Sequence, residues 1–295
     1  MAIAENLKKQ NKEFIILSDR HYSFFDDFSV NVELVKESPE DYLAKYSPEV
    51  VLTATSYTSK LELEFILAAK KKAIRTIVFV DHWTSINERF DFKGSDILPD
   101  DLLLIDDKAY RHAVKNNIPE SICTIYGHPY HDFLKSWKPI QPREDFLESI
   151  GIDKKHEKIL LFAPDPISNL DNGKQEFGFD ETDATKRISD HFNLLSEDVI
   201  ILCQAHPNQD IDKLLSVLPE RVIVLRKNIH LNTLLYHSNL VLGFFSNLLI
   251  EAKIIGTNVL RYFPEESSRD PLEHMKIGLK VNDKGLFEAL ENLLL

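Results

Sequence analysis

The chain has 295 residues, 43% of them hydrophobic, and this length and composition favour two globular domains of roughly 150 residues each. Its formal net charge of -12 argues against nucleic acid or an anionic membrane surface as the main partner, because both attract cationic proteins. The two cysteines, Cys123 and Cys203, lie in apolar strand-like segments, and no apolar run approaches the roughly 20 residues that cross a bilayer, so we expect a cytoplasmic protein with no disulfide scaffold and no transmembrane segment.

In the first half of the chain, short apolar runs alternate with amphipathic segments. Strands are expected at residues 13–18, 31–35, 49–54, 75–80, 101–105 and 121–126, and helices near residues 39–46, 58–73 and 106–117. The segment 137–145, WKPIQPRED, contains two prolines and no apolar periodicity, so it is the best candidate for a linker.

The same alternation starts again after this linker. Strands are expected at residues 158–163, 198–203, 221–225, 239–244 and 257–263, and helices near residues 181–196, 210–218, 230–236, 246–255 and 283–294. Strands that alternate with helices predict parallel sheets. We therefore expect an α/β protein with two Rossmann-like domains facing a central cleft, the first at residues 1–138 and the second at residues 139–295.

Three short motifs point to a known superfamily. YGHPYHDFL at residues 126–134 closes the first half, and AHPNQD at 205–210 and FFSNLLIEA at 244–252 belong to the second. Together with the two Rossmann-like halves, they resemble the GT-B glycosyltransferases and their relatives. The bacterial surface-polysaccharide transferases and the UDP-N-acetylglucosamine 2-epimerases are the most similar in pattern. The resemblance covers most of the chain, but motifs this short identify the superfamily better than the substrate.

The beginning of the chain differs from the GT-B pattern. Such a first domain normally opens with a central strand, a glycine-rich turn and a helix, whereas residues 2–10, AIAENLKKQ, have the pattern of the first helix and residues 13–18 that of the second strand. A buried sheet without its central strand leaves backbone groups unpaired, each at a cost on the order of 1–3 kcal/mol. We therefore expect either that Met1 is not the natural start, or that the first sheet is rearranged or completed by another chain.

The second half carries the candidate nucleotide site. His206 and Pro207 follow one expected strand, and Ser246 and Asn247 follow another, so both pairs are expected at the carboxyl edge of one sheet, where α/β proteins bind ligands. Ser246 is expected at a helix N-cap, where its hydroxyl would bond a backbone N–H and the first-turn amides would cradle a phosphate. The resemblance implies that the HP motif touches the donor nucleotide and that Glu251 lies beside ribose hydroxyls. A loop-capping histidine, an ordinary capping serine and a solvated glutamate are the alternatives.

The segment VFVDHWTSINERF in the first half carries the candidate catalytic groups. Asp81 and His82 end an expected strand, and either could act as the general base that deprotonates an acceptor hydroxyl. Trp83 offers a face for sugar stacking, and Arg89 offers a charge for a phosphate or carboxylate. Ser56 is a weaker candidate for an acceptor contact. The alternatives are capping by Asp81 and His82, a core position for Trp83 and N-capping near Ser56.

Two loops of the second half are candidates to complete the site. The polar loop from residue 163 to 181 offers Ser168, Phe177 and Phe179 as contacts to a base or sugar, because loops of this length in compact domains are often functional. Arg261, at the start of the loop 261–271, is a candidate phosphate ligand. A solvent-facing loop and a surface arginine are the alternatives.

The resemblance, together with these residues, implies a glycosyltransferase that uses a nucleotide-sugar donor and a carbohydrate acceptor in bacterial surface-polysaccharide or lipopolysaccharide biosynthesis. We expect a metal-independent reaction with no cofactor, since the chain lacks zinc-ligand spacing, a P-loop and a dinucleotide-binding glycine motif. The alternatives are a nucleotide-sugar epimerase or hydrolase on the same fold, or a noncatalytic nucleotide-sugar-binding protein, which an interrupted first sheet would favour. The 2-epimerases usually carry Ser-Gly-Gly where this chain has Ser-Asn-Leu, and this difference weakens the epimerase interpretation.

Overall fold

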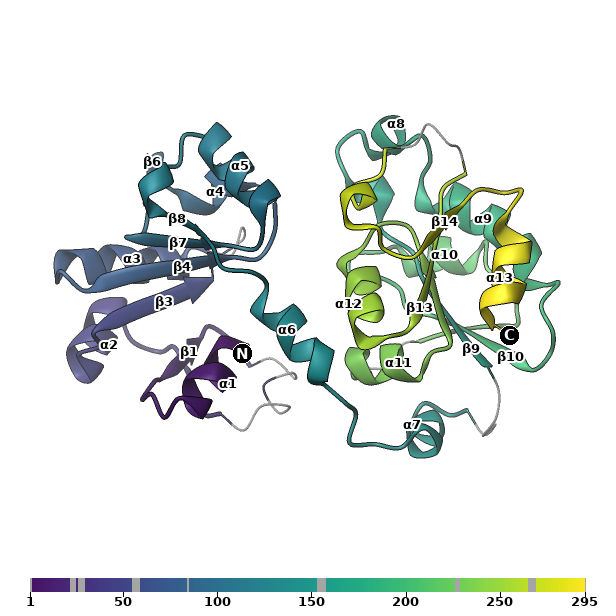
Figure 1. Ribbon diagram of the computed structural model, residues 1–295, viewed down its shortest axis with the longest axis horizontal. Coiled ribbons are helices and arrows are strands. Elements are labelled where there is room, and N and C mark those ends of the chain that lie inside the picture. Colours follow the sequence, from purple (N-terminus) through teal and green to yellow (C-terminus); the bar gives the residue numbers. More distant parts are fainter. Residues whose placement is uncertain are drawn as a thin grey trace. The chain divides into compact units, whose positions relative to one another are not determined.

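The computed structural model describes residues 2–21, 25, 30–54, 59–83, 85–152, 158–225, 229–264 and 269–294. The chain divides into two compact units, Met1–Asp132 and Phe133–Leu295. Each unit is built on parallel β-strands connected through helices, which confirms the predicted α/β class (Figure 1). In the sequence, the boundary between the units falls within helix α6 (Pro129–Ser136), slightly before the boundary expected after residue 138.

The second unit contains one six-stranded parallel sheet with the order β11-β10-β9-β12-β13-β14. Its strands are β9 (Lys158–Ala163), β10 (Val199–Cys203), β11 (Val222–Val224), β12 (Leu240–Gly243), β13 (Asn258–Tyr262) and β14 (Leu279–Val281). The chain runs outward from β9 through β10 to β11 and then returns to the other side of β9 as β12. The strand order therefore reverses between β9 and β12, and the carboxyl ends of these two strands form a topological switch point.

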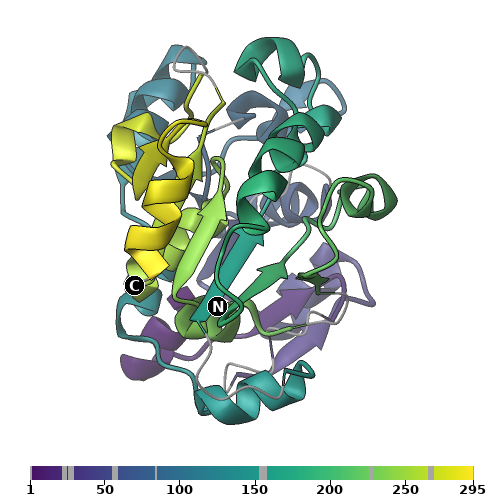
Figure 2. The ribbon, with the colours of Figure 1, turned by 90° about the vertical axis from the view of Figure 1, so that its right-hand side faces the viewer.

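Helices cover both faces of this sheet (Figures 1 and 2). The helices of the unit are α7 (Arg143–Ser149), α8 (Gly173–Phe177), α9 (Glu181–Phe192), α10 (Ile211–Leu215), α11 (Leu231–His237), α12 (Asn247–Ile255) and α13 (Leu286–Leu294), with short 3-10 turns at η3 (Ile167–Asn169) and η4 (Glu273–Met275). Helices α11 and α12 pack together on one face, and α9 and α13 lie on the other. Under α9, the ring of Phe162 on β9 meets Phe192 and Phe244 edge to face, and all three side chains are fully buried.

The main sheet of the first unit has four parallel strands in the order β3-β4-β7-β8. They are β3 (Val50–Ala54), β4 (Arg75–Val80), β7 (Asp101–Leu104) and β8 (Cys123–Ile125). The helices are α1 (Ala2–Lys9), α2 (Pro39–Tyr46), α3 (Leu61–Lys71), α4 (Ile86–Phe90) and α5 (Asp107–Lys115), with a 3-10 turn at η2 (Glu120–Ile122). Helix α3 packs against β3 and β4, and α5 packs against β7 and β8.

Two further strands of the first unit stand apart from this sheet. β1 (Ile16–Ser18) and β2 (Val32–Leu34) pair in parallel with one another. Within the described residues, no backbone ladder joins them to β3, so one edge of β3 has no strand partner there. Val50 and Leu52 on β3 are 41% and 40% exposed. The sequence-based expectation of an interrupted first sheet agrees with this division.

Several short elements were not anticipated from the sequence. The antiparallel pair β5 (Asp91–Phe92) and β6 (Ser95–Asp96), the short helices α4, α7 and α8, and strand β14 are all too short to show a hydrophobic period. Helix α7 also begins inside the predicted linker, because Pro142 occupies its N-cap instead of breaking it. No helix in the described part of the chain is long and apolar enough to cross a membrane.

Candidate functional site

The candidate site is built around the switch point of the second unit. Gly243 at the end of β12 lies opposite Ala163 at the end of β9. A Cβ atom on Gly243 would lie 2.8 Å from the Ala163 carbonyl oxygen and 3.1 Å from a methyl group of Leu249 on α12. Glycine is therefore required here, because it lets the strand end and the start of α12 approach the neighbouring strand closely.

Asp165 links the two strand ends through its side chain. It follows β9 and is 7% exposed, and its Oδ2 atom accepts a hydrogen bond from the backbone N–H of Phe245 at 3.1 Å. The amides of Phe244 and Ser246 also interact with this carboxyl group. Burial outweighs these donors and raises the pKa of Asp165 to about 7. The sequence analysis missed Asp165, whose position directly after a strand was the available signal.

Ser246 occupies the N-cap position of α12, as predicted, but its hydroxyl does not cap the helix. Oγ is buried and has no hydrogen-bond partner among the residues that the structure describes. The amide of Leu249 donates instead to the carbonyl oxygen of Ser246 at 3.1 Å. The predicted side-chain capping bond is thus wrong, and the hydroxyl remains available for another group. Asn247 begins the helix with an exposed side chain.

His206 follows β10 at the same edge of the sheet and is exposed together with Pro207. Its Nδ1 atom accepts a hydrogen bond from the backbone N–H of Asn208 at 3.2 Å. Nδ1 must therefore carry the lone pair, and the neutral ring holds its proton on Nε2. Partial burial lowers the pKa of His206, which favours this neutral form. The geometry presents Nε2–H as a donor at the sheet edge.

Glu251 lies on α12, where it is partly buried. Burial raises the pKa of Glu251 to about 7. A carboxyl group that titrates near neutrality can donate to a ligand hydroxyl when protonated and accept from it when ionised. The predicted contact with ribose hydroxyls remains a prediction.

In the first unit, Asp81 and His82 follow β4 at the carboxyl end of the sheet. The Oδ1 atom of Asp81 lies 3.4 Å from Nη1 of Arg89, which is on α4 and 9% exposed. Arg89 is therefore a buried partner of Asp81, which contradicts its prediction as a ligand-facing charge. His82 is half-buried, and this burial lowers the pKa of the imidazole, so the ring is neutral at pH 7.

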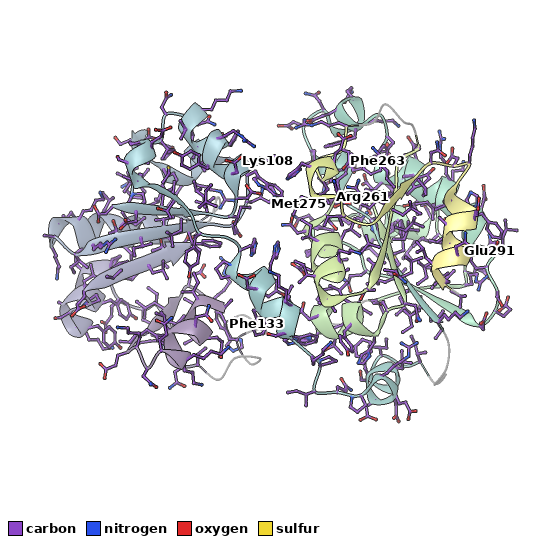
Figure 3. All side chains as sticks on the ribbon, in the orientation of Figure 1. Lys108, Phe133, Arg261, Phe263, Met275 and Glu291 are labelled. Carbon is purple, nitrogen blue, oxygen red and sulfur yellow. The ribbon has the colours of Figure 1, made fainter. Side chains whose placement is uncertain are left out.

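Trp83 belongs to the core of the first unit. Its Nε1–H donates to both carboxylate oxygens of Asp106, at 2.9 and 2.8 Å, and the side chain is 9% exposed. The Lys108 ammonium lies 4.4 Å from the centre of the ring (Figure 3). The predicted role of Trp83 as a sugar-stacking face is wrong, because Asp106 and Lys108 hold the ring in place. Ser56 lies outside the described residues.

His128 is a titratable group in the motif at residues 126–134, which was assigned only to the end of the first half of the chain. It follows β8, and its ring stacks on that of His131 with centroids 3.6 Å apart. Its Nδ1 atom is buried, with no hydrogen-bond partner in the described part of the chain. Burial lowers the pKa of His128, and the charge of Asp81 opposes that shift. Asp81, His82 and His128 therefore share the carboxyl end of this sheet. Within the described ranges, no three His, Cys, Asp or Glu side chains gather as metal ligands.

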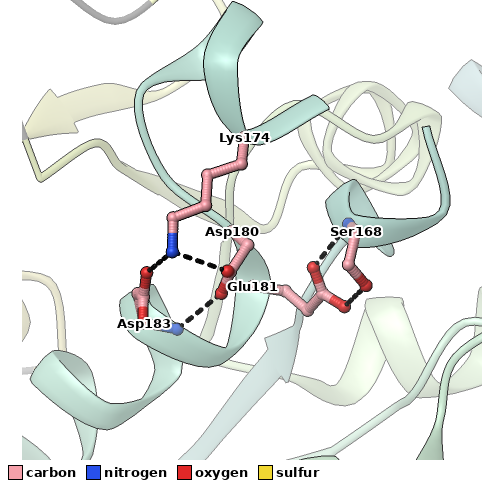
Figure 4. A network of polar contacts seen from close by, with 5 residues as sticks. All are labelled: Ser168, Lys174, Asp180, Glu181 and Asp183. Carbon is pink, nitrogen blue, oxygen red and sulfur yellow. Dashed lines mark hydrogen bonds and ion pairs between the residues drawn. The ribbon is translucent and has the colours of Figure 1, made fainter. Parts of the chain in front are cut away.

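The loop residues proposed to complete the second-unit site have structural roles instead. Phe177 and Phe179 are buried in the hydrophobic core. Ser168 donates its backbone N–H to Glu181 at 2.8 Å, in the polar network that also joins Lys174 to Asp180 and Asp183 (Figure 4). Arg261 is buried in an ion pair with Asp270, above the ring of Phe263 (Figure 3). The burial of Phe177, Phe179 and Arg261 contradicts their predicted ligand contacts, and Ser168 is bonded to Glu181.

No protein-family model and no curated protein sequence matches this chain. Solved structures do match it. A Listeria monocytogenes protein assigned provisionally as a UDP-N-acetylglucosamine 2-epimerase is 15% identical with a TM-score of 0.71, and the match covers 99% of this chain and 83% of that one. The UDP-GlcNAc 2-epimerase of Methanocaldococcus jannaschii is 16% identical with a TM-score of 0.68, covering 99% and 88%.

Anabaena HepE in complex with UDP-glucose is 10% identical with a TM-score of 0.61, and this match covers 99% of the present chain and 84% of HepE. At such low identity, these similarities establish the fold. The chain has two Rossmann-like units with the GT-B fold, which confirms the predicted fold.

Proposed function

We propose that this chain binds a nucleotide sugar at the carboxyl edge of its second unit and acts on the sugar as an epimerase or hydrolase. One observation carries the proposal: a histidine with a directed Nε2–H donor and a serine hydroxyl without a partner lie at the same sheet edge. Both groups suit phosphate oxygens, which accept hydrogen bonds.

The proposed diphosphate site extends between His206 and Ser246. Strands β10 and β12 flank β9, so the two side chains start about 10 Å apart, at two strand spacings. Nε2 of His206 would donate to one phosphate group, and Ser246 Oγ with the N-terminal amides of α12 would bind the other. The helix N-terminus also favours the negative charge. Glu251 would then bond ribose hydroxyls from the same helix.

The choice of nucleotide rests on the similar structures. One Methanocaldococcus jannaschii 2-epimerase structure is a complex with UDP-GlcNAc and UDP, and Anabaena HepE is a complex with UDP-glucose. These complexes make a UDP-hexose the first substrate class to test. The similar structures that are named as UDP-N-acetylglucosamine 2-epimerases also favour epimerisation over glycosyl transfer.

Asp81 and His82 are the proposed proton-transfer groups of the first unit. The exposed carboxylate of Asp81 can accept a proton, and the neutral imidazole of His82 can accept or return one. The proposed reaction uses the nucleotide sugar as substrate and needs no added cofactor or metal ion.

Incubation with UDP-N-acetylglucosamine alone, followed by product analysis, tests the proposal. We expect either the C2 epimer of the sugar nucleotide or free UDP and sugar, and loss of product in Asp81→Asn with nucleotide affinity unchanged. His206→Ala and Ser246→Ala should each weaken nucleotide binding while leaving the protein folded. Binding by both variants as tight as by the native protein would place the nucleotide elsewhere.

Glycosyl transfer to a carbohydrate acceptor is the second candidate. The turn Ser246-Asn247-Leu248 favours glycosyl transfer, because the 2-epimerases that this chain resembles usually carry Ser-Gly-Gly there. UDP that is released only when an acceptor is added would support transfer. Binding without any turnover would support a noncatalytic nucleotide-sugar-binding protein.

A further inference from the structure

Asp165 is a buried carboxyl group whose location the proposed function leaves unexplained. It lies at the switch point, follows β9 and reaches across to the turn that leads from β12 into α12. Three consecutive amides, those of Phe244, Phe245 and Ser246, interact with it. The carboxyl group thus occupies the inner side of the turn whose outer side is the proposed phosphate site.

We propose that Asp165 is the positioning residue of the diphosphate site, and that loss of its proton weakens the binding of a nucleotide sugar. This inference rests on the proposed function of the second unit. The geometry supports the positioning role because Oδ2 fixes the Phe245 amide at 3.1 Å and so orients the start of α12. Asp165 can accept this bond whether its carboxyl group is protonated or ionised. The turn therefore stays in place while the charge of the carboxyl group changes.

Solvent would screen the charge of ionised Asp165 only weakly, because the side chain is buried. Burial raises the pKa of Asp165 to about 7, so the proton is present below neutral pH and is lost above it. Ionised Asp165 would place a negative charge directly beneath the turn that receives a phosphate, where little water separates the two. Binding should therefore weaken as the pH rises through neutrality.

Other titratable groups lie at or near this edge. Glu181 on α9 adds a negative field that raises the pKa of Asp165 further, and its own carboxylate is held by Ser168. Glu251 on α12 also has a pKa raised to about 7. Partial burial lowers the pKa of His206 after β10 and so moves its titration toward acid pH. Glu251 is therefore the group whose titration must be separated from that of Asp165.

Calorimetric titration with UDP-N-acetylglucosamine between about pH 6 and about pH 8 separates the effect of Asp165 from that of Glu251. Both phosphates of this ligand are esterified, so its charge stays constant over the range. We expect the Kd of the native protein to rise about tenfold, the size of effect that one buried like charge produces. Asp165→Asn should remove most of this rise, whereas the exposed control Asp212→Asn should keep the native slope. Glu251→Gln should remove only the part of the slope that Glu251 itself contributes.

The native protein alone gives a second measurement. At about pH 7.5, binding in two buffers of different ionisation enthalpy should reveal uptake of part of a proton for each ligand bound. Absence of proton uptake, or a native slope in Asp165→Asn, would overturn the role of Asp165 while leaving nucleotide binding intact. Failure of the native protein to bind this ligand at any pH would instead contradict the proposed function.

Discussion

The two units differ in how completely their sheets bury their strands. In the second unit, every residue of β10 and β12 is buried, and one sheet runs through all six strands. In the first unit, the described strands form separate sheets, and β3 alternates between exposed and partly buried residues. A fully packed sheet fixes the ends of its strands, so the turn between β12 and α12 is preorganised for a ligand.

This difference suggests a division of roles. The second unit carries the preorganised donor and hydroxyl groups of the proposed nucleotide site. The candidate proton-transfer groups of the first unit follow a four-stranded sheet that, among the described residues, is not joined by β1 and β2. Binding should therefore depend on the second unit and survive changes to β3.

Phe162→Ala should produce the largest loss. The ring is fully buried between Phe192 and Phe244, and removal of such a side chain costs about 3–5 kcal/mol of unfolding free energy. Urea unfolding followed by a probe in the second unit measures this loss. Phe162→Leu is the matched control and should cost clearly less, because it retains most of the packed volume.

A loss below about 1 kcal/mol for Phe162→Ala would contradict the contrast between the units. It would mean that the six-stranded sheet packs no better than the interrupted one.

The pH dependence of stability should change in Asp165→Asn. The folded-state pKa of about 7 lies above the ordinary value of 3.8, so the folded protein binds this proton more tightly than the unfolded chain does. Stability is therefore lost as the pH rises from about 4 to about 7, by at most about 4 kcal/mol, and the penalty is complete above that window.

Asp165→Asn carries no charge and should flatten this part of the profile, with its advantage over the native protein greatest at about pH 8. Parallel stability curves for the two proteins across the window would show that Asp165 ionises normally in the fold.

Gly243→Ala should destabilise the second unit by about 1–3 kcal/mol, because the new Cβ would overlap the carbonyl oxygen of Ala163 at 2.8 Å. Gly285→Ala is the control in the same unit, since its Cβ would meet no atom closer than 3.8 Å. Thermal unfolding of both variants measures the difference. Equal melting temperatures would show that β12 and β9 can separate without cost.

Leu52→Ala should have the smallest effect. Leu52 on β3 is 40% exposed, so its truncation should cost about 1 kcal/mol or less. Leu102→Ala on β7 of the same sheet is the control, because Leu102 is fully buried and should cost about 2–5 kcal/mol. Similar losses for both would indicate that another group covers β3 in solution.

The sequence predicted most of the fold because its longer helices and strands have a clear hydrophobic periodicity. β4 and β9 were expected at residues 75–80 and 158–163 and lie there, and the position of Ser246 followed from a strand, a turn and a helix in succession. The partners of polar side chains were not predictable. Arg261 pairs with Asp270, and Asp165 bonds an amide 80 residues away, contacts that periodicity does not encode.

Hydrogen exchange of backbone amides with and without UDP-N-acetylglucosamine would locate the nucleotide site in the chain. Protection on binding should appear at residues 204–209 and 244–251 of the second unit, and it should be lost in His206→Ala and Ser246→Ala. Protection confined to the first unit, or none at residues 244–251 under saturating ligand, would contradict the assignment of the nucleotide site.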